Sequence, residues 1–254
     1  MTKMLKSSAA GADKINRAAE LALVQERIRA CRLCQEHGYI PCAHPLVSGR
    51  ADDRIMVIGQ APGHRSVARD LPFSGPGGRI LQRWLERAGF PPDYLHEHTY
   101  LSSLTHCDPG KNPRGNGDRR PSPPEVALCR QHLAAELRVV NPKVILLVGT
   151  MAIEDLLSQY PQPDREHEID GEPSSARTNA HDLTRKNTPR SRGFTQGKIK
   201  LEDVIGTYQE RDGRLLLPLP HPSGVSRWLN DAEHQKLLEK ALALLAQWRT
   251  YYYL

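Results

Sequence analysis

The stretch KVILLVG, residues 143–149, decides the fold class. Its unbroken run of Val, Ile and Leu, closed by a glycine, is typical of a strand that is buried on both faces. The residues that follow, TMAIEDLL at 150–157, predict a short helix. A buried strand followed directly by a helix indicates a parallel sheet covered by helices.

The same alternation extends outward from this strand in both directions. Short apolar runs predict further strands at 54–59, 99–104 and 214–220. Periodic apolar residues predict helices between and around them, and Ser122-Pro-Pro-Glu125 is a capping box that opens one of these helices. Strands that alternate with helices predict an α/β fold with helices on both faces of a parallel sheet.

Composition narrows the function classes. The chain has 254 residues, a formal net charge of +6 and five cysteines. The positive charge favours a polyanionic partner. The N-terminus lacks the apolar stretch of a secretory signal, no run is long enough for a membrane span, and we expect a cytoplasmic protein. In such a protein an odd number of cysteines indicates metal or redox chemistry rather than disulfides.

Two segments lie outside the periodic pattern. Residues 1–15 are polar and basic, and we expect a disordered tail. Residues 161–200 are poor in apolar residues and rich in Pro, Ser, Asn and Arg, which predicts a mobile insertion. A solvated loop is the favoured interpretation of its basic half, and an arm that contacts DNA is the alternative.

The cysteines suggest a metal centre. Cys31 and Cys34 form a CxxC, Cys107 follows the second predicted strand, and Cys129 lies on the capped helix. If the intervening loop folds back, the four thiolates converge on either tetrahedral zinc or an iron–sulfur cluster. The alternative for Cys129 is a small buried apolar side chain. Cys42 remains as the odd thiol, and its replacing any one of the four is the alternative.

Four short motifs occur in order along the chain, the first and the last of them at the ends of predicted strands. They are GQAPG (59–63), PFSGPGGRILQRWL (72–85), CDPG with GDRRPSPPEVALC (107–129), and PHPSG (220–224). Open α/β sheets place their ligand sites at this edge. Together with the four cysteines, the set resembles the uracil-DNA glycosylase superfamily, in particular its branch with a four-cysteine [4Fe–4S] cluster. The resemblance covers about residues 28–160 and 201–248.

This resemblance implies a three-layer α/β/α sandwich around a four-stranded parallel sheet, formed by one domain over 16–254. It implies a monomeric, monofunctional DNA glycosylase that hydrolyses the N-glycosidic bond of uracil or another deaminated base and so starts base-excision repair. The cluster ligands would be Cys31, Cys34, Cys107 and Cys129.

The resemblance also assigns roles at the base. His221 would donate a hydrogen bond to the base carbonyl oxygen, where negative charge develops on departure. The best-known branch has an aspartate and a tyrosine in the 59–63 loop, but this chain has Ala61 and Gly63. Gln60 and the 60–61 peptide groups are therefore the candidates for orienting water. His64 and Asp70 are held in reserve.

The base pocket would be formed by Gly59, Ala61, Phe73 and Ser103. Phe73 occupies the position that stacks on the flipped base, and its alternative is a loop anchor packed into the core. Ser103 stands where the family has a base-reading asparagine. Because a serine hydroxyl rotates and is shorter than an amide, we expect looser discrimination among deaminated bases.

DNA contacts would come from two loops. Val225 is at the position of the minor-groove wedge, followed by Ser226, by Arg227 for phosphate and by Trp228 for stacking. Packing against the last helix is an equal alternative for Trp228. Phosphate contacts near the cluster are expected from Lys111, Arg119 and Arg120.

Two other functions remain open on the same residues. A non-catalytic Fe–S protein that binds damaged DNA would explain Ala61 and Ser103. An Fe–S electron carrier would leave the GQAPG and PHPSG loops without a purpose, and it ranks last.

Overall fold

The computed structural model describes residues 2–113, 115, 117–158, 199–222 and 227–254, with backbone only for 2–15 and Arg227. The insertion predicted at 161–200 lies outside the described residues except for Ile199 and Lys200. Within the described ranges, none of the helices combines the length and the apolarity that a membrane crossing requires.

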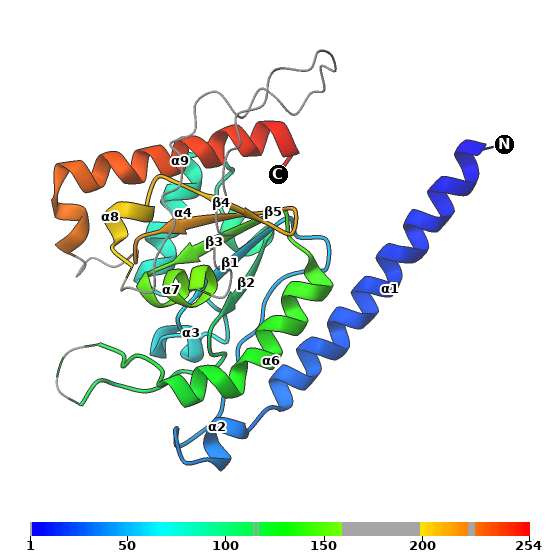
Figure 1. The fold of residues 1–254 in the computed structure, drawn as a ribbon. Helices are drawn as coiled ribbons and strands as arrows, with labels where there is room; N and C mark the ends of the chain where they lie inside the picture. The colour runs from blue at the N-terminus through cyan, green and yellow to red at the C-terminus, as the bar shows by residue number, and fades with distance from the viewer. Residues whose placement is uncertain (1, 114, 116, 159–198, 223–226) are drawn as a thin grey trace, which may run out of the picture.

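A five-stranded sheet with the order β2-β1-β3-β5-β4 forms the centre of the structure (Figure 1). Four strands are parallel neighbours and confirm the predicted α/β class; they are β1 (Ile55–Gly59), β2 (Thr99–Ser103), β3 (Val144–Val148) and β5 (Arg214–Leu219). The predicted bounds of these strands differ from the observed ones by no more than one residue at either end.

The prediction of four strands is wrong in number, because β4 (Gln209–Arg211) pairs antiparallel with β5. The turn between them is Asp212-Gly213, with φ of 50° and 74°. Two consecutive residues with positive φ are typical of a tight hairpin turn, for which Asp-Gly is a preferred pair. This dipeptide was the sequence signal for the fifth strand. The strand itself is too short and polar to show a pattern.

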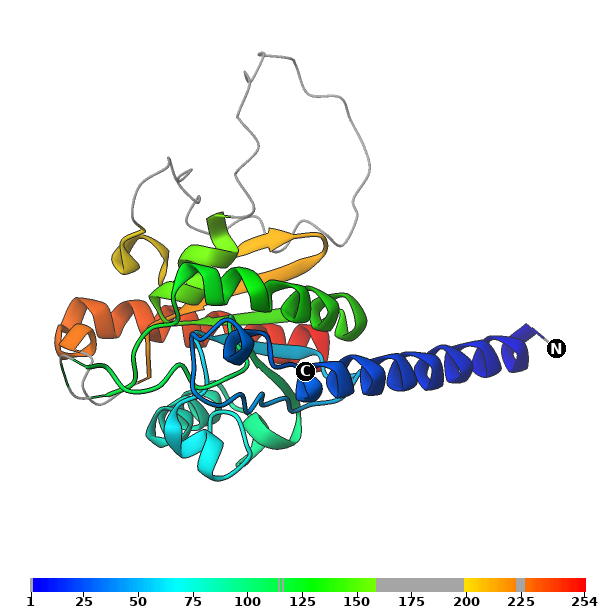
Figure 2. The same ribbon diagram turned by 90° about the horizontal axis from the view of Figure 1, so that it is seen from below.

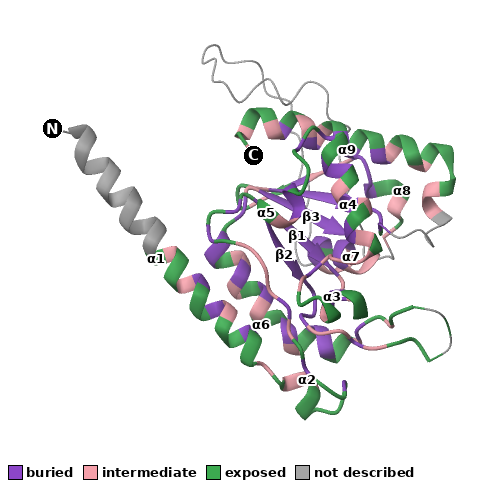
Figure 3. Ribbon diagram, turned by 180° about the vertical axis from the view of Figure 1, so that it is seen from behind, coloured by how far each residue is buried: buried purple, intermediate pink, exposed green. Residues whose placement is uncertain are grey.

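Helices cover both faces of the sheet, so the architecture is a three-layer α/β/α sandwich (Figure 2). Successive strand residues point to opposite sides: Ile55 and Val57 belong to one apolar cluster, Met56 and Ile58 to the other. One face packs against α1 (Thr2–Ala30), α6 (Pro123–Val140), α7 (Thr150–Ser158) and α8 (Leu201–Val204). The other packs against α4 (Pro76–Arg87), α5 (Tyr94–Glu97) and α9 (Ala232–Tyr252). The strands are buried throughout, apart from β4 and the first residue of β5 (Figure 3).

Helix α6, which carries Cys129, is held by hydrogen bonds at both ends. At its start the backbone N–H and the hydroxyl of Ser122 both donate to the Glu125 carboxylate at 2.7 Å, so the predicted capping box is present. At its end Arg17 of α1 donates to the carbonyl oxygens of Val139 and Val140, at 3.2 and 2.6 Å. These bonds satisfy terminal groups of the helix and hold α1 against α6.

Helix α1 differs from the prediction at its start. A disordered tail was expected over 1–15, but the helix begins at Thr2. The segment MLKSSAA contains Met, Leu, Lys and Ala, which are strong helix formers. Extending an existing helix adds one hydrogen bond per residue without a new nucleus, so the helix predicted at 16–30 continues backward through them.

Candidate active site and candidate metal centre

The parallel strands bring the predicted base-site loops to one edge of the sheet. Gly59 ends β1 and pairs in register with Ser103, the last residue of β2. Farther along the same edge, the Gly149 N–H donates to the carbonyl oxygen of Leu219, where β5 ends. His221 follows two residues later. The carboxyl ends of parallel strands lie at one edge, and this edge is where open α/β sheets bind ligands.

His221 lies against a glycine backbone. A Cβ built on Gly149 would lie 3.2 Å from the imidazole Cδ2 and crowd the ring, and the φ of +85° at Gly149 favours glycine. His221 is exposed to solvent. Surrounding protein nevertheless lowers the pKa of His221 by desolvation, and the nearby positive charge of Arg120 lowers it further. The ring is therefore neutral at pH 7 and carries one N–H donor.

Phe73 lies over the end of β1. Its backbone is in the left-handed region with a φ of 54°, and a Cβ on Gly59 would meet its ring at 2.9 Å. The following helix, α4, begins beside His221, because a Cβ on Gly77 would come within 2.9 Å of the Pro222 carbonyl oxygen. Phe73, partly buried against the core, thus lies at the same edge as Ser103. This location fits both stacking on a base and the loop-anchor alternative.

Asp118 brings to the 59–63 loop a carboxylate that was not among the predicted site residues. A Cβ on Gly63 would be 2.6 Å from its Oδ2, and the His64 backbone N–H donates to the same carboxylate. Desolvation and the negative charge of Asp108 raise the pKa of Asp118. The carboxylate therefore occupies the space that a side chain at position 63 would fill.

The other water-orienting candidates differ in their surroundings. The backbone carbonyl oxygen of Gln60 accepts from the Thr105 N–H at 3.2 Å, and this bond fixes the loop backbone. Gln60 and the adjacent Ala61 are both partly exposed. His64 is exposed at the start of α3 (His64–Ala68). Asp70 lies 2.9 Å from the imidazole Nε2 of His44 and is already partnered.

The predicted DNA-contacting residues of the loop after β5 differ in how far the structure describes them. Val225 and Ser226 lie outside the described residues, and only the backbone of Arg227 is described, in the short helix η1 (Arg227–Asn230). Trp228 stacks on His234, with ring centroids 4.2 Å apart and an interplanar angle of 2°. It also packs against the core, which favours the packing interpretation.

Arg119 and Arg120 are placed differently although they are adjacent. Arg119 makes a bidentate pair with Glu125, at 2.7 Å for both bonds, and donates to the Tyr39 carbonyl oxygen at 3.0 Å. This pairing raises the pKa of Arg119, and it lowers the pKa of Glu125 against the opposing effect of burial. Arg119 therefore holds the loop to α6. Arg120 is exposed and available for a phosphate.

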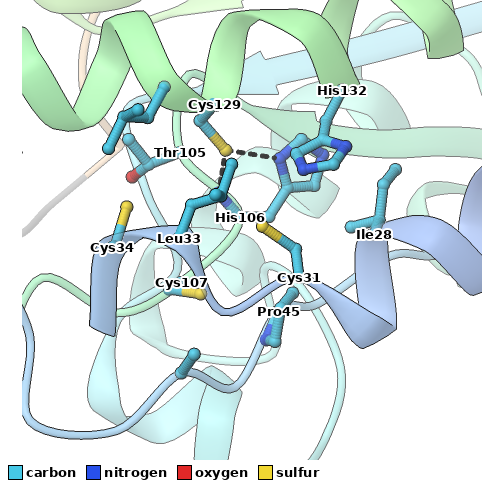
Figure 4. Close-up of a pocket in the computed structure, with 12 residues that line it drawn as sticks. Ile28, Cys31, Leu33, Cys34, Pro45, Thr105, His106, Cys107, Cys129 and His132 are labelled. Atoms are coloured by element: carbon cyan, nitrogen blue, oxygen red, sulfur yellow. Dashed lines mark hydrogen bonds between the residues drawn. The ribbon is translucent and has the colours of Figure 1, made fainter. Parts of the chain in front are cut away.

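The four predicted metal ligands line one cavity (Figure 4). Cys31 follows α1, Cys34 lies in α2 (Leu33–Glu36), Cys107 follows β2, and Cys129 projects from α6. The loop between Cys107 and Cys129 does fold back, as the metal hypothesis required. Cys42 is exposed and lies outside the cavity lining.

The chemistry of this cavity suits a metal centre held by thiolates. Desolvation, with the charges of nearby Cys129, Glu125 and Cys31 added, raises the pKa of Cys34 to about 11. Burial likewise raises the pKa of Cys107 to about 12. A positively charged centre reverses this preference, since a coordinating thiol is deprotonated outright. Two of the residues that line the cavity also have a buried polar atom without a partner in the described structure, Thr105 Oγ1 and His132 Nε2. Among the described residues, however, no three His, Cys, Asp or Glu side chains form a ready-made group around a single ion.

A buried ion pair, for which the sequence shows no local signal, lies at the wall of the cavity. His106 Nε2 lies 3.0 Å from a Glu136 carboxylate oxygen, and Nδ1 lies 3.2 Å from the Cys129 sulfur. Burial alone would lower the pKa of His106, but the negative charge of Glu136 and the bonds to both partners raise it to about 10.

Comparisons with known proteins agree with the resemblance that the four motifs and the cysteines indicate. Residues 47–246 match the model of the uracil DNA glycosylase superfamily. The chain is 30% identical over 134 residues to a type-4 uracil-DNA glycosylase of Thermotoga maritima, a match that covers 52% of this chain and 64% of that protein. It is 27% identical over 141 residues to the type-4 uracil-DNA glycosylase of Archaeoglobus fulgidus, covering 54% and 63%. For that of Saccharolobus solfataricus the identity is 28% over 130 residues, covering 51% and 55%. The matches thus span less than two thirds of each relative's length.

Proposed function

Because the chain belongs to the uracil DNA glycosylase superfamily, we propose that it hydrolyses the N-glycosidic bond of uracil or another deaminated base in DNA. One observation carries this proposal: the exposed His221, which lies against Gly149 after β3, is at the same edge of the sheet as Phe73, which lies over the end of β1. A flipped base needs a π surface and a fixed hydrogen-bond donor for its carbonyl oxygen, and this edge offers both.

His221 supplies the donor for the leaving group. As the bond to the sugar breaks, the base takes the electron pair and becomes negatively charged. A preorganised N–H at the carbonyl oxygen stabilises that charge more than it stabilises the neutral base, so it lowers the barrier. A neutral imidazole is suitable, because its single N–H can donate without a proton being transferred.

Asp118 and Gln60 orient the attacking water. The 59–63 loop has no carboxylate of its own, and Asp118 reaches it from the loop after Cys107. A carboxylate there would accept a hydrogen bond from the water and stabilise the positive charge that develops on the sugar. Asp118→Asn should lower kcat by about 10²-fold, the lower end of general acid–base contributions, since the side chain is exposed. Single-turnover cleavage measures this effect. A parental rate in Asp118→Asn would show that Gln60, and not Asp118, orients the water.

The four cysteines that line the cavity would hold a [4Fe–4S] cluster. The cluster would supply a structural tie among α1, α2, the loop after β2 and α6, and so fix the segment that carries Asp118 and Arg120. Anaerobically purified protein should contain iron and sulfide together. Cys42→Ser should retain the iron and Cys31→Ser should lose it. Stoichiometric zinc without sulfide would contradict the cluster.

Substrate choice rests on Ser103, which is buried at the end of β2. The relatives are named for uracil, and uracil is the first expected substrate. Without an asparagine amide at this position, hypoxanthine and xanthine are expected to be accepted more readily than in a pocket that reads one base edge. The cell compartment is proposed to be the cytoplasm and the protein to be a monomer.

Release of free base is the deciding experiment. Duplex and single-stranded oligonucleotides that each contain one uracil, hypoxanthine or xanthine are incubated with the holoprotein, and free base and abasic DNA are quantified. Release from at least one substrate is the expected result. Tight binding to these oligonucleotides without any release would instead support the non-catalytic DNA-binding alternative.

A further inference from the structure

Four polar side chains are buried beside the cysteine cavity, which one of them, His106, also lines, and catalysis at the sheet edge uses none of them. Tyr100, Ser102, His106 and Glu136 are each exposed by 2% or less. Ionisable groups in such surroundings are unfavourable unless they are fully partnered. Their presence therefore has to be explained by the contacts that they make.

Glu136 is held by three partners. Its Oε2 accepts from the Ser102 hydroxyl at 2.6 Å and lies 3.0 Å from His106 Nε2. Its Oε1 accepts from the Tyr100 hydroxyl at 3.0 Å. Tyr100 and Ser102 belong to β2, whereas Glu136 belongs to α6. The carboxylate is thus fixed between sheet and helix, and it fixes the direction of the His106 ring.

His106 directs two donors at one sulfur atom. Its backbone N–H donates to Cys129 Sγ at 3.3 Å, and its ring Nδ1 lies 3.2 Å from the same atom (Figure 4). A cysteine that ligates a metal is a thiolate without a proton, so the N–H between these atoms has to be on the ring. Glu136 on the far side keeps the ring in this orientation, as carboxylates do behind many metal-bound histidines.

We propose that His106, oriented by Glu136, is a positioning residue of the metal centre that sets the stability and the reduction potential of the cluster through its hydrogen bond to Cys129. The inference rests on the cluster in the proposed function. Hydrogen bonds to cluster sulfurs are among the features by which proteins set these potentials. A donor withdraws negative charge from the thiolate and favours the reduced cluster, which carries one more electron.

Two substitutions at position 106 separate the contact with sulfur from the contact with the carboxylate. The amide of His106→Asn lies near the position of ring Nδ1 and keeps a donor toward Cys129. The amide of His106→Gln lies near the position of Nε2 and keeps the partner of Glu136, but it loses the ring donor to sulfur. His37→Gln is the matched control, because His37 is an exposed histidine at the end of α2 whose Nδ1 contacts the Leu33 carbonyl oxygen.

The measurements use anaerobically purified holoproteins: the rate of iron release to a chelator and the midpoint potential of the cluster. His106→Gln should release iron about 10–100-fold faster than the parent, the usual effect of losing a partner of a metal ligand, and its potential should be more negative. His106→Asn should lie closer to the parent in both measurements. His37→Gln should match the parent.

Several outcomes would overturn the proposal. Parental values for both variants would show that the ring bond to sulfur has no effect on the centre. A larger effect of Asn than of Gln would assign the role to the Glu136 contact, as a purely structural pair. If the parent binds no iron but releases uracil, the cluster itself is absent from the active protein. If the parent binds iron but releases no base, the glycosylase proposal fails independently of His106.

Discussion

The sheet edge that carries His221 and the cavity that carries the cysteines use side chains in opposite ways. At the edge, the rings of Phe73 and His221 lie against the backbones of Gly59 and Gly149, and neither residue is fully buried. Around the cavity, polar side chains bond to one another in the interior, and His106 is joined to both Cys129 and Glu136. The edge thus leaves its side chains without side-chain partners of the kind that fix His106, which is consistent with the proposed base site at the edge and the proposed structural role of the cavity region.

Replacing His221 with Ala tests this division with the largest expected effect. Loss of a donor to the leaving base should lower kcat by about 10²–10³-fold, while affinity for DNA and iron content stay close to parental. Because desolvation lowers the pKa of His221 below its ordinary value, the ring stays neutral as pH falls from 8 to 7, so the charge of His221 should not change parental kcat over that range. Single-turnover rates from pH 6 to 8 measure both effects. A His221→Ala protein that cleaves at the parental rate would move the role elsewhere.

Gly149→Ala should misplace His221 without removing it. The added Cβ would come within 3.2 Å of the ring, and a φ of +85° is unfavourable for alanine. We expect kcat to fall about tenfold, less than for a full misplacement of 1 Å, and the free energy of unfolding to fall by about 1–2 kcal/mol. Cleavage and denaturant unfolding measure these two changes. Unchanged kcat would mean that the position of His221 is not held by this contact.

Arg119→Ala examines the other region, with Arg120→Ala as its matched control. Glu125, whose side chain is 3% exposed, would lose its bidentate partner, so the free energy of unfolding should fall by about 2 kcal/mol. Arg120→Ala should leave stability unchanged, weaken binding to DNA of any sequence and reduce the salt slope by about 1. Urea unfolding and salt-dependent binding distinguish the two. The reverse pattern would show that Arg119 contacts DNA and that Arg120 stabilises the fold.

Ser103→Asn should have the smallest effect, a change of substrate ranking. Restoring an amide next to Gly59 should favour uracil over hypoxanthine and xanthine, seen as a higher ratio of kcat/KM values. Iron content should not change, because Ser103 does not line the cysteine cavity. If the parent cleaves only uracil and the variant keeps the same ranking, backbone groups of the 59–63 loop read the base.

Much of the fold could be predicted because its signals are local. The four parallel strands have short apolar runs, and the capping box at Ser122 is a pattern within a few residues. The antiparallel strand β4 was missed, because it is short and polar and only the Asp212-Gly213 turn marks it. The helical start of α1 was missed for another reason: its strong helix formers were outweighed by the polar, basic character of residues 1–15.

The sequence by itself determined the α/β alternation, the four cysteines and the strand-end positions of Ser103 and His221. Residue order is enough for these, since strand periodicity and strand ends are properties of neighbouring residues. Only the tertiary structure decided that Asp118 reaches the 59–63 loop, that Arg119 is held by Glu125, and that His106 joins Cys129, 23 residues away, to Glu136, 30 residues away. Such contacts depend on how a loop folds back over a helix, and no local pattern of residues encodes that path.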